Sequence, residues 1–167
     1  MQQEILFTEE QKFKQWWLWL VILGLNGFFL FLAYQQLILK KQVGNRPITD
    51  NGLLISIGII VLITLMFFYT KLKTCIKKDG IYVQFFPFHF SYKYYGWETV
   101  AKVYVRTYNP LGEFGGWGLR YSFTGNGTAY NVSGDKGLQL ELNTGKKILI
   151  GTNKAAELEK VLNQLHR

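Results

Sequence analysis

The sequence predicts a two-helix transmembrane hairpin followed by an all-β barrel or sandwich of about seven antiparallel strands, capped by a C-terminal α-helix. Three observations predict this class: two long uncharged apolar runs, period-two alternation over most of the remaining chain, and a helical apolar period at its end. Apolar residues make up 49% of the 167 residues although the net charge is +8. An ordinary soluble monomer does not combine such a high apolar content with such a high charge. The two values are compatible if the apolar residues are concentrated in one part of the chain.

The first apolar run is WWLWLVILGLNGFFLFLAY, nineteen uncharged residues at 16–34. The second is LLISIGIIVLITLMFFY, seventeen uncharged residues at 53–69. At a rise of 1.5 Å per residue, each crosses most of a hydrocarbon core of about 30 Å. The alternative is a pair of core helices in a soluble bundle, but neither run has the polar stripe of such helices. We therefore expect transmembrane helices at residues 16–39 and 53–70.

The connection at residues 40–52 is short and contains Gly44, Pro47 and Gly52, so the spans should form an antiparallel hairpin with this loop outside. Cations favour the opposite side, where six lysines flank the spans against Lys40, Lys41 and Arg46 in the loop. By the positive-inside rule both termini face the cytoplasm, including an N-terminal segment at residues 1–15. A single cysteine agrees with a reducing compartment.

Residues 71–167 should form one cytoplasmic β domain. Apolar and polar residues alternate along several short runs, for example at Ile81, Val83 and Phe85 and again at Leu138, Leu140 and Leu142. Turn residues such as those of NTGKK separate the runs. We expect about seven antiparallel strands with one apolar face, including one within FHFSYKYY and one reaching Phe123.

The end of the chain predicts a helix at residues 153–166. Its N-cap would be Thr152 or Asn153, and apolar residues recur with the period of one helix face at Leu158, Val161, Leu162 and Leu165. Such a helix must bury its apolar stripe, and the open end of the barrel is the obvious place.

Three segments carry a likeness to a known family: KKDGIYVQFFPF, GWETVAKVYVRTYNPLGEFGGWGLR, and YNVSGDKGLQLELNTGKKILIGTNKAAELEKVL. Over residues 71–165 the chain resembles pleckstrin-homology-like (PH-like) domains of bacterial membrane proteins. The resemblance implies a PH-like fold placed next to a membrane. Together with the two apolar runs, it predicts a multi-pass integral membrane protein of the bacterial inner membrane. It implies no function, because fold alone does not supply one.

Chemistry-bearing patterns are scarce. The glycines between Gly112 and Gly118 precede a strand-like run instead of opening a helix, so a phosphate-binding loop is not expected. The two histidines lie far apart in sequence and have no ligands at metal spacing. We therefore expect no enzyme, no cofactor and no metal site. Nucleic acid is not an expected partner either, since strand aromatics pack cores more often than they stack on bases.

Basic residues offer the strongest candidate binding surface. Lysines that follow the second span would lie near anionic headgroups, and two arginines would extend the surface across the sheet. The candidate contacts for anionic lipid or an acidic partner are Lys71, Lys73, Lys77, Lys78, Arg106 and Arg120. The alternative is that the lysines only fix topology, as positive flanks commonly do.

Two functional hypotheses follow. In the first, the chain is a membrane-anchored binding or scaffold module that recruits lipid headgroups, a peptide or a protein. In the second, it is an accessory subunit of a larger membrane complex or a homo-oligomer. Helix contacts for that assembly would come from Asn26 together with Gly24, Gly27 and Gly58, because small and amide side chains favour close helix packing in lipid.

Overall fold

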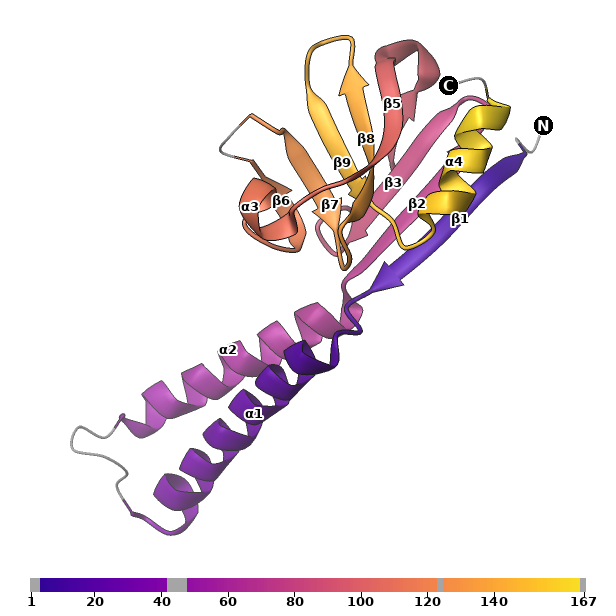
Figure 1. Ribbon diagram of the computed structural model, residues 1–167. Coiled ribbons are helices and arrows are strands. Elements are labelled where there is room, and N and C mark those ends of the chain that lie inside the picture. The colour runs from indigo at the N-terminus through magenta and orange to yellow at the C-terminus, as the bar shows by residue number, and fades with distance from the viewer. Residues whose placement is uncertain (1–3, 42–47, 123–124, 166–167) are drawn as a thin grey trace. The chain divides into compact units, whose positions relative to one another are not determined.

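The computed structural model describes residues 4–41, 48–122 and 125–165 (Figure 1). The chain forms two compact units, Met1–Phe13 with Thr70–Arg167, and Lys14–Tyr69. The second unit is thus an insertion into the sequence of the first. Part of the predicted outer loop at residues 42–47, the strand residue Phe123 and the predicted helix end at residue 166 lie outside the described residues.

The inserted unit consists of two long apolar helices, as predicted. The first comprises α1 (Trp16–Ala33) and a π-helical turn, η1 (Tyr34–Ile38), and the second is α2 (Asp50–Tyr69). Both Trp16–Ile38 and Asp50–Tyr69 are long and apolar enough to cross a membrane. The buried residues of α1 and α2 are Ile22 and Leu53, so neither helix lies in a core of this chain.

The second helix begins three residues earlier than predicted. The Thr49 hydroxyl oxygen accepts a hydrogen bond from the Gly52 backbone N–H at 3.2 Å, and Leu53 N–H donates to Thr49 O at 2.9 Å. Thr49 therefore acts as an N-cap, and Asp50 in the first turn suits the positive end of the helix dipole. Residues 50–52, which were predicted to belong to the loop, therefore form the start of the helix.

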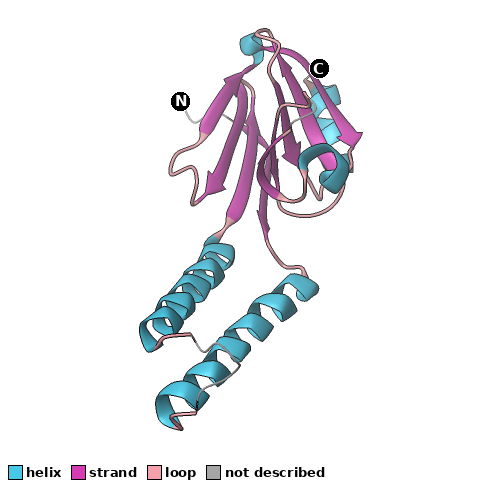
Figure 2. Cartoon of the chain, turned by 90° about the vertical axis from the view of Figure 1, so that its left-hand side faces the viewer, coloured by secondary structure: helices cyan, strands magenta, loops and turns pink. Residues whose placement is uncertain are grey.

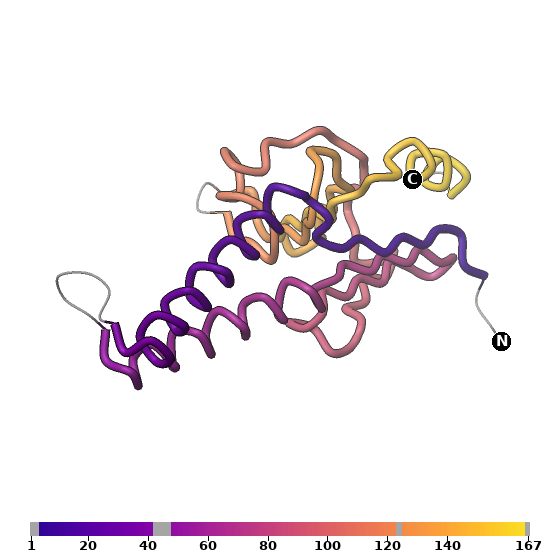
Figure 3. The backbone as a smooth tube through the Cα atoms, turned by 90° about the horizontal axis from the view of Figure 1, so that it is seen from below, coloured from indigo at the N-terminus to yellow at the C-terminus, as the bar shows by residue number. Residues whose placement is uncertain are grey.

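The other unit contains a four-stranded antiparallel sheet in the order β1-β2-β3-β4. Its strands are β1 (Ile5–Lys12), β2 (Lys71–Lys77), β3 (Gly80–Phe86) and β4 (Lys93–Gly96). The sequence predicts no strand within residues 1–15, yet β1 pairs along the whole of β2, and Figure 3 shows the indigo β1 beside the magenta β2. The whole helical insertion lies in the β1–β2 connection.

A second sheet has five strands in the order β5-β8-β9-β7-β6, joined to the first by the 3₁₀ turn η2 (Trp97–Thr99). The strands are β5 (Val100–Thr107), β6 (Gly118–Tyr121), β7 (Thr128–Asn131), β8 (Lys136–Leu142) and β9 (Lys147–Gly151). The sequence missed the short β7, and β7 runs parallel to β9, which corrects the expectation of antiparallel strands throughout.

The core lies between the sheets and extends to a second layer. Inward-facing residues such as Leu72, Ile81 and Leu140 are fully buried. Leu149 instead joins a cluster with Tyr108, Phe114 and Ala129, in which the short helix α3 (Pro110–Phe114) contributes Phe114. Part of the second sheet is thus covered on both faces. This explains why all three residues of ILI at 148–150 are buried and why the sequence there is continuously apolar instead of alternating.

The C-terminal helix α4 (Ala155–Gln164) buries Leu158, Val161 and Leu162. It contacts β1 and β5, the edge strands of the two sheets, together with β8. Figure 2 shows the cyan helix beside the magenta strands of the sandwich. Two apolar helices as a hairpin, β-sheets and a C-terminal helix confirm the predicted fold class, and the arrangement agrees with a PH-like sandwich.

Candidate functional site

The candidate site is the outer face of the first sheet. Along β2, Leu72, Thr74 and Ile76 are buried, and the alternate residues Lys71, Lys73, Cys75 and Lys77 are half-buried on the opposite face. This follows from the two-residue period of a strand, because the inner positions supply the core and leave the lysines outside.

Aromatic side chains of β3 lie beside these lysines. Lys71 pairs in register with Phe86, and Cys75 pairs with Tyr82. The Lys71 Nζ lies 5.8 Å from the centre of the Phe86 ring, and the Lys77 Nζ lies 4.7 Å from that of Tyr82. Both distances are within cation–π range. We call Lys71, Lys73, Cys75, Lys77, Tyr82 and Phe86 the lysine–aromatic face.

Carboxylates neutralise part of this basic surface. Glu10 on β1 lies 3.6 Å from the Lys73 Nζ and 3.5 Å from the Lys12 Nζ, and Glu4 lies 2.7 Å from the Lys78 Nζ. The hydrogen bond between Glu4 and Lys78 lowers the pKa of the Glu4 carboxyl. Among the described residues, Lys71 and Lys77 have no carboxylate within ion-pair distance, so their charges are available to an anionic ligand.

A shallow pocket of about 270 Å³ opens on the same face, lined by Ile5, Thr8, Cys75, Lys77, Tyr82 and Tyr92. The Tyr82 hydroxyl donates a hydrogen bond to Asp79, which raises the pKa of Tyr82 to about 12. Burial raises the pKa of the Cys75 thiol, so this cysteine is a poor nucleophile at neutral pH. The thiol that lines the pocket is therefore not activated as a nucleophile.

The candidate lysines lie along a strand instead of forming one cluster. Lys71 and Lys77 are at opposite ends of β2. Six residues at about 3.3 Å each separate them by roughly 20 Å, about twice the Debye length at 0.1 M salt. Lys78 lies in the turn beyond. A single headgroup cannot contact all four.

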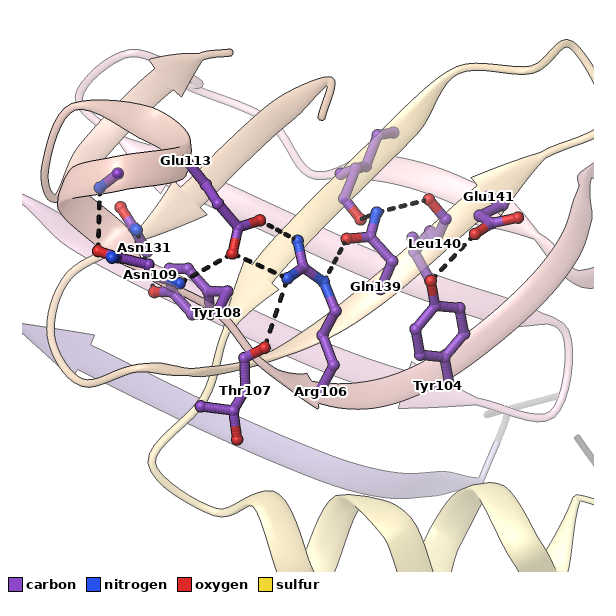
Figure 4. Close-up of polar contacts among 12 residues, drawn as sticks. Tyr104, Arg106, Thr107, Tyr108, Asn109, Glu113, Asn131, Gln139, Leu140 and Glu141 are labelled. Carbon is purple, nitrogen blue, oxygen red and sulfur yellow. Dashed lines mark hydrogen bonds and ion pairs between the residues drawn. The ribbon is translucent and has the colours of Figure 1, made fainter. Parts of the chain in front are cut away.

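The two candidate arginines belong to the second sheet, so the structure does not join them to the lysines. Arg106 on β5 makes a bidentate ion pair with Glu113 on α3, with hydrogen bonds of 2.7 and 3.1 Å, and donates to Gln139 at 3.0 Å (Figure 4). Its donors are thus engaged in holding α3 to the sheet. Arg120 on β6 is exposed and donates to the Trp117 carbonyl.

The candidate helix-contact residues separate into two groups. The Asn26 amide donates to the Thr64 hydroxyl at 2.8 Å, which joins α1 to α2 within the hairpin. Gly24, Gly27 and Gly58 are exposed, and a Cβ at any of them would meet no atom within 4 Å. Asn26 is therefore used inside the chain, whereas the glycines play no part in packing the hairpin.

A further polar cluster, which the sequence did not reveal, joins β1 to the start of α4. The Glu9 carboxylate accepts hydrogen bonds from the Thr152 hydroxyl at 2.6 Å and the Asn153 N–H at 2.8 Å. Gln11 donates to the Gly151 carbonyl at 2.7 Å. All these contacts close the sandwich, and no group of three or more potential metal ligands occurs among the described residues.

One family model, described as "Family of unknown function (DUF6141)", matches residues 2–165. The match includes β1, both apolar helices and the whole sandwich. Neither a curated protein nor a solved structure matches the chain.

Proposed function

The chain belongs to DUF6141, a family of unknown function, and from that premise we propose that it is an integral membrane protein presenting its β-sandwich as a binding module at the inner membrane surface. The proposed ligand is an anionic surface, with the headgroups of the adjoining leaflet as the nearest one. Two helices long enough to cross a membrane support the anchor.

The observation that carries this proposal is the pairing of Lys12 with Lys71. The helix α1 begins four residues after Lys12, and α2 ends two residues before Lys71. Since both lysines belong to neighbouring strands of one sheet, two spans inserted between them must begin and end on the same side of the bilayer. This agrees with the cation count, which favours the cytoplasmic side.

The lysine–aromatic face supports the choice of ligand. Lys71 and Lys77 pack against aromatic rings, which orient an ammonium without neutralising it. Near an anionic leaflet each cation contributes about 1 kcal/mol. Because β2 spreads its lysines, we propose that Lys71, which follows α2 directly, makes the headgroup contact. Lys73 joins it by exchanging its 3.6 Å ion pair with Glu10 for a lipid headgroup.

Topology is tested with single cysteines in a Cys75→Ser background. Lys41→Cys, three residues beyond the first helix, should react with a membrane-impermeant maleimide in intact cells. Lys102→Cys, on exposed β5, should react only after the cells are permeabilised. Labelling of Lys102→Cys in intact cells, or release of the protein by alkaline carbonate, would contradict the proposal.

Ligand binding is tested with Cys75 itself, which lies between Lys73 and Lys77 on the proposed face. The full chain is reconstituted in neutral or anionic nanodiscs, and alkylation by uncharged N-ethylmaleimide is timed. Alkylation should be slower in anionic discs, and the difference should vanish when Lys71 and Lys73 are both replaced by Gln. Equal rates in both discs would contradict headgroup binding. Lys102→Cys with Cys75→Ser controls for effects of disc charge.

A second candidate function, accessory subunit of a membrane complex, rests on the free glycines of the hairpin. Their exposure leaves small-residue surfaces that suit another helix. Gly24→Leu with Gly58→Leu should then abolish co-purification of a partner or a second copy from gently solubilised membranes. The control is Leu62→Phe, which adds bulk at another exposed position. An unchanged complex would exclude this function.

A further inference from the structure

We propose that the loop between β3 and β4 is an additional membrane contact, whose aromatic side chains Phe88 and Phe90 enter the interfacial region of the bilayer. The inference rests on the proposed function, because it requires the apolar helices to span the membrane. It assigns a role to a segment that neither the anchor nor the lysine–aromatic face explains.

The loop exposes aromatic side chains at high density. Phe90 is 84% exposed and Phe88 is 51% exposed, and Tyr92 at the end of the loop is also exposed. Single exposed apolar residues are ordinary on protein surfaces, but a concentration of them marks an interaction site. Three exposed aromatic residues within five positions of the chain are such a concentration.

Hydrogen bonds and ring contacts hold the loop in place. The His89 N–H donates to the Phe85 carbonyl at 2.8 Å, and the Gln84 side chain donates to the Phe90 carbonyl at 2.8 Å. The Phe88 ring stacks on Phe85 at 5.8 Å between centroids, while Phe90 meets Phe86 edge-on at 6.0 Å. The aromatic residues are therefore presented by a fixed backbone, which lowers the entropy cost of inserting them.

Strand register places the loop at one particular end of the sheet. Phe86 pairs with Lys71, and Lys71 pairs with Lys12. This row is the end at which the chain leaves β1 for α1 and returns from α2 to β2. Because Phe88 and Phe90 follow Phe86 directly, the loop extends from the sheet end where the chain passes to both apolar helices.

Charge at this end favours lipid as the occupant. Lys12, Lys14 and Lys71 are close in the chain to the helix ends, and residues 86–92 contain no carboxylate. Aromatic rings accompanied by lysines are the composition that membrane interfaces favour, because the rings enter the headgroup boundary and the ammoniums reach anionic lipid. A protein partner would not require the patch to adjoin the helix connections.

The test uses the full chain with Cys75→Ser, reconstituted in liposomes that contain a lipid with a shallow nitroxide. An environment-sensitive fluorophore is attached to Phe90→Cys, to Leu111→Cys on α3, or to Leu23→Cys on α1. Leu111 is the matched control, since it is an apolar residue that is 66% exposed on the second sheet's side of the sandwich. Leu23 reports whether the hairpin is in the bilayer.

We expect several-fold stronger nitroxide quenching and a blue-shifted emission at Phe90→Cys than at Leu111→Cys. Quenching at Leu23→Cys without quenching at Phe90→Cys would overturn the loop contact alone. Absence of quenching at Leu23→Cys would instead refute the proposed function. A Phe90→Cys probe that is shielded from iodide but unquenched by nitroxide lipid would show a protein contact, and would also overturn the inference.

Discussion

Glu9 and Thr152 are 143 residues apart in the chain, and the Thr152 hydroxyl donates a 2.6 Å hydrogen bond to the buried Glu9 carboxylate. The same carboxylate accepts a hydrogen bond from the Asn153 N–H, two residues before α4 begins. The first strand therefore satisfies polar groups at the start of the last helix. Contacts between the first strand, β1, and the residues before the last helix, α4, therefore close the sandwich. The helical insertion follows β1 directly in the chain.

Removing the Glu9 carboxylate should destabilise the sandwich. In Glu9→Ala, the Thr152 hydroxyl and the Asn153 N–H lose their acceptor in a buried site, which should cost about 3 kcal/mol of unfolding free energy. Urea unfolding in detergent, followed by the Trp97 and Trp117 fluorescence of a variant with Phe at the other tryptophans, measures it. Glu10→Ala is the control, since its exposed ion pairs should contribute less than about 1 kcal/mol. Equal losses in both variants would contradict the closing role.

The β domain should require β1. A chain of residues 70–167 alone lacks Phe7, Glu9 and Gln11 and exposes the edge of β2, so it should not fold. Replacing residues 14–69 with Asn-Gly should restore a folded domain, because this dipeptide suits a tight turn between adjacent antiparallel strands. Amide dispersion in NMR spectra distinguishes the two chains. Native-like dispersion of residues 70–167 alone would show that β1 is dispensable.

The missed β1 shows how far the sequence pattern could be followed. Its inward positions alternate correctly, but they include Glu9 and Gln11, and these polar residues hide the apolar period of the strand. Their buried partners lie around residue 152, and no local pattern contains that contact. The apolar helices, by contrast, were predictable because composition alone defines them.

The candidate site was predictable only in part, for the same physical reason. The two-residue period of a strand places Lys71, Lys73 and Lys77 on one face, as observed in β2. Sequence could not exclude Arg106 from that surface, because the ion pair with Glu113 depends on where α3 folds. The parallel pairing of β7 with β9 could not be predicted from sequence for a similar reason, because β8 lies between the two strands in the chain.

Two glycines with nearly the same φ should respond differently to substitution. Gly125 and Gly127 have φ of 83° and 82°, but only a Cβ at Gly127 would lie against the Lys147 carbonyl oxygen, inside van der Waals contact. Gly125→Ala should cost about 1 kcal/mol for backbone strain alone. Gly127→Ala should cost about 3 kcal/mol or more, because β9 must move away. Thermal unfolding measures both, and equal losses would contradict this account.

Acid should weaken the Arg106–Glu113 contact. The hydrogen bond from Arg106 lowers the pKa of the Glu113 carboxyl below its ordinary value of 4.5. Because the folded-state pKa is the lower one, this stabilisation is complete above 4.5 and is lost as the pH falls through the folded-state pKa. Glu113→Gln should lose about 1 kcal/mol at neutral pH and show a shallower loss on acidification. Glu157→Gln, at an exposed ion pair, should resemble the parent in urea titrations. A parallel acid decline in Glu113→Gln and the parent would contradict the assignment.

The bond between Asn26 and Thr64 predicts that Asn26 stabilises the hairpin and is not free for assembly. A double-mutant cycle of Asn26→Leu and Thr64→Val, followed by SDS unfolding of the hairpin, should give a coupling of about 0.6 to 1.7 kcal/mol. Gly24→Ala should leave hairpin stability unchanged, because its added Cβ would meet no atom within 4 Å. If the coupling is zero and Asn26→Leu instead disrupts association with another protein, the amide acts between chains and the interhelical bond does not contribute.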